Sequence, residues 1–332
     1  MNRGQGHQEI SLNLIENLIF ILALLPTLRF SFSATCWICH QFIDKIIFEG
    51  QDTMTNQPLQ IVVTAPYFGS LFQIAILDHF KKLVDPENLS FRSSTGEVDK
   101  QSESLKKMFV ENKPTVLIAI SMCPHPDIIS MYKTNNVPII LLDEEAAGAS
   151  TIATDNSLGG QLAAEYLVSK GRKRIAIITG RTQSRENYAG NYNARLRLKG
   201  FSDALRHKGL AIPPGCSIEV PNYSREDGVA AMPKLIDAGV DAIFCAAADN
   251  TAIGLLTAAK QKGIRVPEDI AIIGFDDLPI AQNSRPKLTT IRQPMKEIVE
   301  TAYKMATTQR EEILTNPKKV LFKPELIIRQ SA

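Results

Sequence analysis

The chain has 332 residues, 44% of them hydrophobic and 22% charged, so it can bury two cores of ordinary domain size, about 100 to 200 residues each. Its 37 basic residues nearly balance its 35 acidic residues, and the formal net charge is +2. This balance excludes recruitment of nucleic acid or of a membrane by the field of the whole protein. The 5 cysteines are an odd and sparse set, which argues against a disulfide framework and favours a reduced, cytoplasmic protein.

The first 53 residues differ from the rest. Residues 17–28 read NLIFILALLPTL, about a dozen mostly apolar residues, whereas a membrane-spanning helix needs roughly 20. We therefore predict no membrane span. The length of this run suits the apolar part of a signal peptide, although Arg3 is the one basic residue that precedes it, against Glu9 and Glu16. A periplasmic protein, with residues 1–34 as its signal peptide, is the alternative to a cytoplasmic one.

Cys36, Cys39 and His40 have the C-x-x-C-H spacing with which two thiols take the vinyl groups of haem while the histidine ligates iron. The sequence shows no small helical haem domain around them, and covalent attachment of haem needs an exported chain. A motif of five residues without its structural context is weak. We interpret it as a chance match, and we predict no cofactor and no metal site.

After Pro58, short apolar runs alternate with amphipathic stretches, which is typical of a parallel sheet with crossover helices. The first series predicts strands at 59–64, 89–93, 115–120 and 137–142, and helices at 68–84, 100–111 and 126–135. The second series predicts helices at 158–170, 192–208, 226–238 and 250–262, and strands at 174–179, 217–220, 241–246 and 270–273.

Three glycines, Gly171, Gly209 and Gly263, come where helices of the second series should end, because glycine accepts the left-handed backbone of a helix C-terminus. A last helix, 294–314, is expected to return to the first lobe, and 321–328 to supply a closing strand. The predicted fold class is α/β, with two lobes that are each a parallel sheet flanked by helices. Ligands of parallel sheets bind beyond the carboxyl ends of the strands, so the ligand cleft should lie between the lobes.

Four segments of the body resemble the effector-sensing domain of LacI/GalR-type regulators, and the resemblance runs from Leu59 to the C-terminus, about four-fifths of the chain. They are TDNSLGG (154–160), RLRLKGF (195–201), VPEDIAIIGFDD (266–277) and PKLTTIRQP (286–294). The last is similar to a segment of the repressors and is less typical of periplasmic sugar-binding proteins. Each segment alone is weak, but their order and spacing together indicate the family.

The resemblance implies a periplasmic-binding-protein-like fold. We expect an N-terminal lobe of residues 58–152 plus 289–316 and a C-terminal lobe of residues 153–288 plus 317–332. It also implies a sugar-like effector in the cleft, whose binding closes the lobes and changes the output of a DNA-binding homodimer. Repressors of this family begin with a helix-turn-helix head, and residues 1–53 contain no recognisable one. DNA would therefore be bound only through a head that this sequence does not reveal.

Two charged residues are expected to hold the effector. Arg197 lies where the family places its effector-gripping arginine, and its guanidinium offers five fixed donors for two hydroxyls or a carboxylate. Its alternative is a solvated helix arginine. Asp276 follows a strand, where a carboxylate can accept from two sugar hydroxyls. We interpret the adjacent Asp277 as structural, and Asp155 as the cap of the helix that follows it.

Four further residues complete the predicted site. Phe72 and Tyr223 fall where the family places aromatic rings against the ligand, with ordinary core packing as the alternative. Ser121 and Asp143 end strands of the first lobe and can reach the cleft. The chain departs from the family at Ala247, which stands where an asparagine commonly faces the ligand, so one usual polar contact is missing.

Three functions compete. The first is the effector-sensing domain of a LacI-type transcription regulator, and the second is an exported or solo sugar-binding receptor that does not bind DNA. An enzyme is disfavoured, because the body shows no Gly-rich phosphate loop, no metal-ligand spacing and no nucleophile with an obvious base. We therefore predict no catalytic residues.

Overall fold

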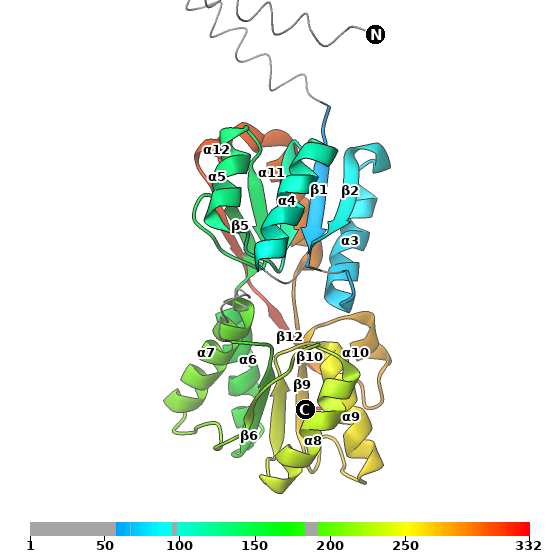
Figure 1. Ribbon diagram of the computed structural model, residues 1–332. Helices are drawn as coiled ribbons and strands as arrows, with labels where there is room; N and C mark the ends of the chain where they lie inside the picture. The colour runs from blue at the N-terminus through cyan, green and yellow to red at the C-terminus, as the bar shows by residue number, and fades with distance from the viewer. Residues whose placement is uncertain (1–57, 67, 95–97, 183–191) are drawn as a thin grey trace, which may run out of the picture. The chain divides into compact units, whose positions relative to one another are not determined.

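Two six-stranded sheets organise the part of the chain that this computed structural model describes, residues 58–66, 68–94, 98–182 and 192–332 (Figure 1). The first sheet has the order β11-β5-β4-β3-β1-β2, and all its neighbouring strands are parallel. Its strands are β1 (Ile61–Ala65), β2 (Leu89–Ser93), β3 (Val116–Ile120), β4 (Ile139–Leu142), β5 (Ser150–Thr154) and β11 (Lys319–Phe322).

The second sheet has the order β12-β10-β9-β8-β6-β7 and is parallel except where β12 pairs antiparallel with β10. Its strands are β6 (Ile175–Thr179), β7 (Ser217–Glu219), β8 (Ala242–Cys245), β9 (Ala271–Asp276), β10 (Thr289–Arg292) and β12 (Glu325–Ile327). The predicted α/β class with two mainly parallel sheets is confirmed.

Helices cover both faces of each sheet, so the central strands are apolar on both sides. In β1, for example, Ile61 and Val63 face one core while Val62 faces the other, as the alternation of side chains along a strand requires. The first sheet carries α3 (Leu71–Leu83) and α11 (Met295–Thr308) on one face, and α4 (Val98–Asn112) and α5 (Pro126–Thr134) on the other. The second carries α6 (Asn156–Ser169) with α7 (Tyr192–His207), and α8 (Arg225–Asp237) with α9 (Asp249–Gln261).

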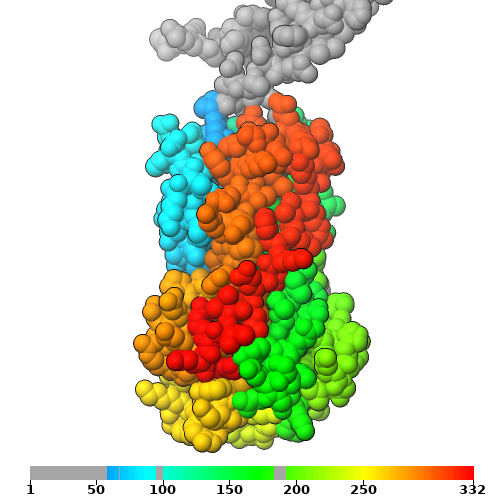
Figure 2. Space-filling view, turned by 180° about the vertical axis from the view of Figure 1, so that it is seen from behind, coloured from blue at the N-terminus to red at the C-terminus, as the bar shows by residue number. Residues whose placement is uncertain are grey.

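The chain crosses between the lobes three times: from β5 to α6, from β10 to α11, and from β11 to β12. Figure 2 shows the last crossing as the red segment that runs over the junction of the lobes. Hydrogen bonds join the three crossings. Thr154 Oγ1 donates to Gln293 Oε1 over 2.7 Å, and the amide of Asp155 donates to the carbonyl of Phe322 over 2.7 Å. The crossings therefore form one hydrogen-bonded hinge.

These crossings correct the predicted lobe boundaries, 58–152 plus 289–316 and 153–288 plus 317–332. The first sheet reaches residue 154, because β5 lies between β4 and β11. Strand β10 belongs to the second lobe, since Leu288 and Ile291 are buried in its cores, and β11 belongs to the first. The predicted closing strand at 321–328 is therefore two strands in two sheets.

The last predicted helix does return to the first lobe, where α11 packs against α3. It is not continuous to residue 314, because α11 ends at Thr308 and α12 (Arg310–Thr315) follows. The hydroxyls of Thr307 and Thr308 donate to the carbonyls of Tyr303 and Lys304. Such bonds offer the backbone carbonyls near the end of α11 a second donor.

Residues 1–57 lie outside the described residues, and with them the signal-like run and the Cys36–His40 motif. Within the described ranges, no helix combines the length and the apolar character needed to cross a membrane.

Two glycines allow α6 and α7 to touch. A Cβ at Gly160 would overlap the carbonyl oxygen of Arg197, and a Cβ at Gly200 would overlap that of Ser157. This close approach fixes the helix that carries Arg197 against the first helix of the second lobe.

Gly200→Ala is expected to lower the free energy of unfolding by about 1–3 kcal/mol, because the added methyl group forces the two helices apart. The better helix propensity of alanine, about 1 kcal/mol, offsets part of this loss. Urea unfolding followed by circular dichroism measures the change. Lys199→Ala, at the exposed neighbouring position, is the control, and a Gly200→Ala midpoint equal to that of the wild type would contradict the packing.

Candidate functional site

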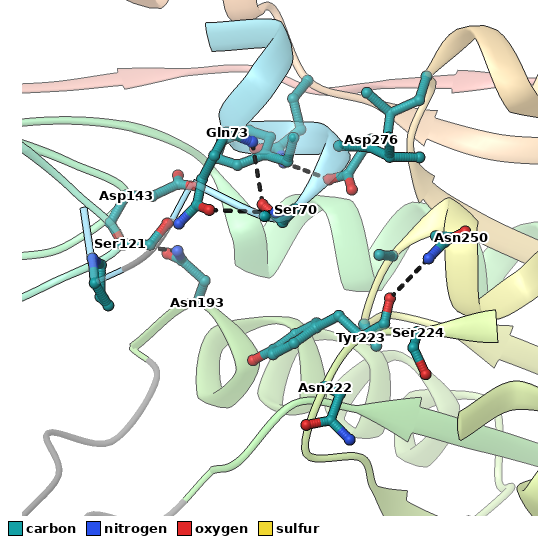
Figure 3. A pocket seen from close by; sticks show the side chains of 18 of the residues that line it. Ser70, Gln73, Ser121, Asp143, Asn193, Asn222, Tyr223, Ser224, Asn250 and Asp276 are labelled. Carbon is teal, nitrogen blue, oxygen red and sulfur yellow. Dashed lines mark hydrogen bonds between the residues drawn. The ribbon is translucent and has the colours of Figure 1, made fainter. Parts of the chain in front are cut away.

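A cavity of about 580 Å³ lies between the two lobes, where the carboxyl ends of the strands face each other. Its volume is in the range of about 300–1,000 Å³ that is usual for small-molecule sites. Figure 3 shows it from close by, with residues of both lobes around it. All six residues predicted from the sequence line it: Phe72, Ser121, Asp143, Arg197, Tyr223 and Asp276.

Four of these six residues have a left-handed backbone. The φ angle is 51° at Ser121, 64° at Asp143, 56° at Tyr223 and 113° at Asp276. Such angles are uncommon outside glycine and tend to occur where a structure holds side chains for function. Here Ser121, Asp143 and Asp276 lie at the carboxyl ends of β3, β4 and β9, so the turn of the backbone directs each side chain toward the cavity.

Arg197, on α7, is 7% exposed and is held by the second lobe. Its Nε donates to Asn156 Oδ1 over 2.7 Å, and its Nη1 donates to the carbonyl of Ala246 over 2.9 Å. The guanidinium carbon lies 3.6 Å from the centre of the Phe275 ring, a cation–π contact. The solvated-arginine alternative is therefore wrong, since this side chain is buried and fixed in place.

Asp276 connects the cavity to the hinge. Its side chain is buried, and Oδ1 accepts from Gln293 Nε2 over 2.7 Å. Gln293 in turn accepts from Thr154. Burial raises the pKa of Asp276 to about 7, with a contribution from Asp143, while Arg197 and the Gln293 bond act in the opposite direction. A ligand that contacts this carboxyl group is thus one hydrogen bond away from Gln293, a residue of the hinge.

Asp143 is the second acid of the cavity and comes from the first lobe. Its side chain is 4% exposed, and its Oδ1 has no hydrogen-bond partner among the described residues. The amide of Thr154 donates to the carboxylate. Burial raises its pKa, although Arg197 and the Thr154 amide oppose this.

The two aromatic residues lie on opposite lobes. Phe72 is in the first turn of α3 and is partly buried against the first core. Tyr223 precedes α8, and its hydroxyl rests on Gly180, where any Cβ would overlap the ring. Figure 3 shows the Tyr223 ring below the two acids, Asp143 and Asp276. The ring therefore forms the second-lobe wall of the cavity.

The two residues interpreted as structural do act so. Asp277 is bound by two arginines, with 2.7 Å between Oδ2 and Arg292 Nε and 2.5 Å between Oδ1 and Arg329 Nη2. Asp155 caps α6, accepting from the amide of Leu158 over 3.0 Å. Neither residue lines the cavity.

Sequence reasoning missed several polar lining residues, namely Ser70, Gln73, Asn193, Asn222, Ser224 and Gln293. Three of these were within reach of the sequence. Ser70 and Gln73 have the spacing of a capping box ahead of an apolar helix, and each accepts from the backbone amide of the other. Asn193 lies one helical turn before Arg197 and therefore shares its face.

The departure at Ala247 is visible in the cavity, where Ala247 and Ala248 form an apolar part of the second-lobe wall. Asn250 also lines the cavity, and its Nδ2 donates to the carbonyl of Tyr223 over 3.3 Å, while its Oδ1 accepts from Arg225. The polar group near this wall is thus already engaged by the protein.

Direct contacts join the lobes at one side of the cavity. Asn193 Nδ2, from the second lobe, donates to the carbonyl of Asp143 over 2.6 Å. Tyr192 donates from its hydroxyl to Glu145 Oε2 over 2.7 Å, and Lys319 Nζ is also 2.7 Å from that oxygen. These contacts hold the lobes together beside the acids. Among the described residues, no group of histidine, cysteine and acidic side chains could hold a metal ion.

The fold and the cavity together define a two-lobed domain that encloses a small ligand in its cleft. Residues 164–332 match the model of the periplasmic binding protein-like domain family. The chain is 28% identical over 272 residues to the HTH-type transcriptional repressor PurR of Escherichia coli O1:K1 / APEC. The aligned residues cover 80% of this chain and 76% of that protein. The chain therefore belongs to the periplasmic binding protein-like family and carries an effector-binding domain of the LacI/GalR type.

Solved structures have the same fold. The lac repressor dimer bound to operator and the anti-inducer ONPF is 22% identical, with a TM-score of 0.73 over 85% of this chain and 97% of that chain. Transcription regulator CcpA of Lactococcus lactis is 22% identical, with a TM-score of 0.69 over 83% and 100%. A LacI family regulator from Enterococcus faecium with bound ribose is 23% identical, with a TM-score of 0.69 over 82% and 98%.

Glu144, beside the cavity, supplies a test of the buried acids. Its pKa is raised to about 8, mainly by burial and also by Asp143. The folded chain therefore keeps this proton between about pH 4.5 and 8, where the unfolded chain loses it, and the free energy of unfolding falls as pH rises through this window. The raised pKa values of Asp143 and Asp276 also make the free energy of unfolding fall as pH rises.

In Glu144→Gln, the free energy of unfolding is expected to fall less between about pH 4.5 and 8 than in the wild type. The difference is several kcal/mol over this window, because each pKa unit corresponds to about 1.4 kcal/mol. Urea unfolding of the variant and the wild type at about pH 5, 6.5 and 8 measures it. If the free energy of unfolding depended on pH equally in the two proteins, the pKa of Glu144 would be the same in the folded and the unfolded chain.

Proposed function

We propose that this domain senses a small sugar-like effector and controls a LacI-type transcription regulator. The observation that carries the proposal is the cavity, on which six residues chosen from the sequence converge from both lobes. A ligand that contacts Asp143 in one lobe and Asp276 in the other binds the closed arrangement better than an open one. Such differential affinity is what lets a ligand shift a conformational equilibrium.

The homodimer and the DNA output belong to the same proposal. The lac repressor neighbour is a dimer bound to operator, and the PurR relatives are transcriptional repressors by name. We propose a cytoplasmic homodimer in which closure of the lobes changes how a DNA-binding head is presented. We further propose that the cavity binds its ligand without transforming it, because its acids, Asp143 and Asp276, have no nucleophile with a base beside them among the described lining residues.

A second candidate is an exported or solo sugar-binding receptor. The apolar run at residues 17–28 and the lack of a recognisable helix-turn-helix in residues 1–53 favour it. The repressor-like segment 286–294 favours the regulator. Its residues form β10 and lead through Gln293 into α11, so this segment is part of the hinge.

Arg197→Lys is expected to weaken sugar binding at least about tenfold while keeping the charge, because lysine cannot reproduce the planar fork. D-ribose, D-glucose and D-galactose, tested with the full chain by thermal shift and then calorimetry, are the probes. Arg195→Lys is the control, since Arg195 is exposed on the same helix and does not line the cavity. Equal loss in both variants, or binding unaffected by Arg197→Lys, would contradict the proposed site.

The DNA output is tested by mixing the full chain with fragmented DNA of its native host and sequencing the bound fraction. We expect enrichment of a few sites with two-fold symmetry, and a change in their retention when a binding sugar is added, because a symmetric dimer reads symmetric half-sites. A flat distribution of fragments, together with an intact mass that shows loss of about 30 residues in the native host, would support the exported receptor instead.

A further inference from the structure

The cavity contains a buried acceptor that the protein leaves unused. Asp143 Oδ1 is enclosed and has no hydrogen-bond partner among the described residues, although the carboxylate as a whole accepts from the Thr154 amide. A buried acceptor without a donor is costly, because it has lost its water without a replacement. Asp143 lines the cavity, so a ligand there can supply the missing donor.

Acidic side chains outnumber basic side chains on the buried part of the lining. Asp143 and Asp276 face the cavity from opposite lobes, and Figure 3 shows them on either side of the same space. The one buried cation among the described lining residues is Arg197, and two of its nitrogens already donate to Asn156 and Ala246. Arg225 also lines the cavity, but it is exposed, where solvent screens its charge.

The helix ends at the cavity do not reverse this balance. Helices α3 and α8 begin there, and a free helix N-terminus favours an anion. Both, however, are capped by their own side chains, Ser70 with Gln73 and Ser224 with Asp227. Helix α9 begins with the buried acid Asp249, whose Oδ1 and Oδ2 accept from Thr290 and from the amide of Leu278.

One part of the second-lobe wall is apolar, beside the polar lining residues Asn222, Ser224, Arg225 and Asn250. Ala247, Ala248 and the Tyr223 ring form it on the side of the second lobe. Apolar faces of sugar rings pack well on such a wall, whereas a charged substituent there would lose its hydration without a partner. A charged group of the ligand therefore belongs on the side of Asp143.

We propose that the effector is a cationic polyol, such as an amino sugar, whose protonated amine binds Asp143. The inference rests on the proposed sensing function and specifies its ligand class. The ammonium group donates to the carboxyl group of Asp143, and the apolar face of the ring lies on Tyr223. Neutral sugars lack the charge, and phosphorylated sugars bring a charge of the wrong sign.

Two matched triplets test the proposal on the full chain: glucose, glucosamine and glucose 6-phosphate, and galactose, galactosamine and galactose 6-phosphate. Calorimetry at about pH 6.5, where the amine of an amino sugar keeps its proton, gives the affinities. In at least one triplet we expect the amino sugar to bind about tenfold or more tightly than the neutral sugar, and the phosphate to bind weakest, as one charge-assisted hydrogen bond supports.

Asp143→Asn identifies the residue responsible. Asparagine tolerates the left-handed backbone at this position, so the fold is kept while the charge is lost. The variant is expected to lose most of its preference for the amino sugar while its affinity for the neutral sugar changes less. Asp237→Asn, at an exposed position near the far end of α8, is the control and should bind like the wild type.

The outcomes separate this inference from the proposed function. Tighter binding of the neutral sugar or of the phosphate, in a triplet that binds at all, overturns the inference and leaves the sensing function standing. Equal losses of both sugars in Asp143→Asn also overturn it, because the residue would then act through the fold. If none of the six probes binds and D-ribose does not bind either, the proposed sensing function is overturned, and the inference with it.

Discussion

The hydrogen bond between Thr154 and Gln293 joins two chain crossings, and the behaviour of the cleft depends on it. Gln293 uses its other end to hold Asp276, which faces the cavity. A single amide side chain thus contacts both the hinge and the acid of the second lobe. Because the third crossing is joined to the first through Asp155 and Phe322, a change in the distance between the lobes must be accommodated by backbone torsions beside these few residues.

The sequence allowed most of the fold to be predicted, because continuous apolar β-branched runs and amphipathic helices carry strong periodic signals. Strand β5 was missed for a physical reason. Its residues, STIAT, include one large apolar side chain, and they are buried only because β4 and β11 lie on either side. Strand β10 was missed likewise, since Thr289 and Thr290 look exposed in sequence but are fully buried. Tertiary packing, which no local pattern records, decides both.

The residues of the candidate site also fall into those that the sequence predicts and those that depend on tertiary packing. Residues at strand ends, such as Asp143 and Asp276, were predictable, because parallel strands bring their carboxyl ends to one edge. Arg197 came from the resemblance to the family rather than from its surroundings. Gln293 was not predicted, because an amide side chain has no preferred periodicity and its role depends on which groups the fold brings to it. The unpartnered oxygen of Asp143 is likewise a property of three-dimensional enclosure.

The path of the last residues has a consequence for biosynthesis. The first sheet is complete only when β11 joins β5, and the second only when β12 joins β10, although both sheets begin much earlier in the chain. Ser331, which follows β12, ties this segment to β9 by donating its hydroxyl to the carbonyl of Ile272 over 2.6 Å. Neither lobe can therefore finish its sheet before residues 319–327 have been synthesised, so the two lobes are completed at nearly the same point of synthesis.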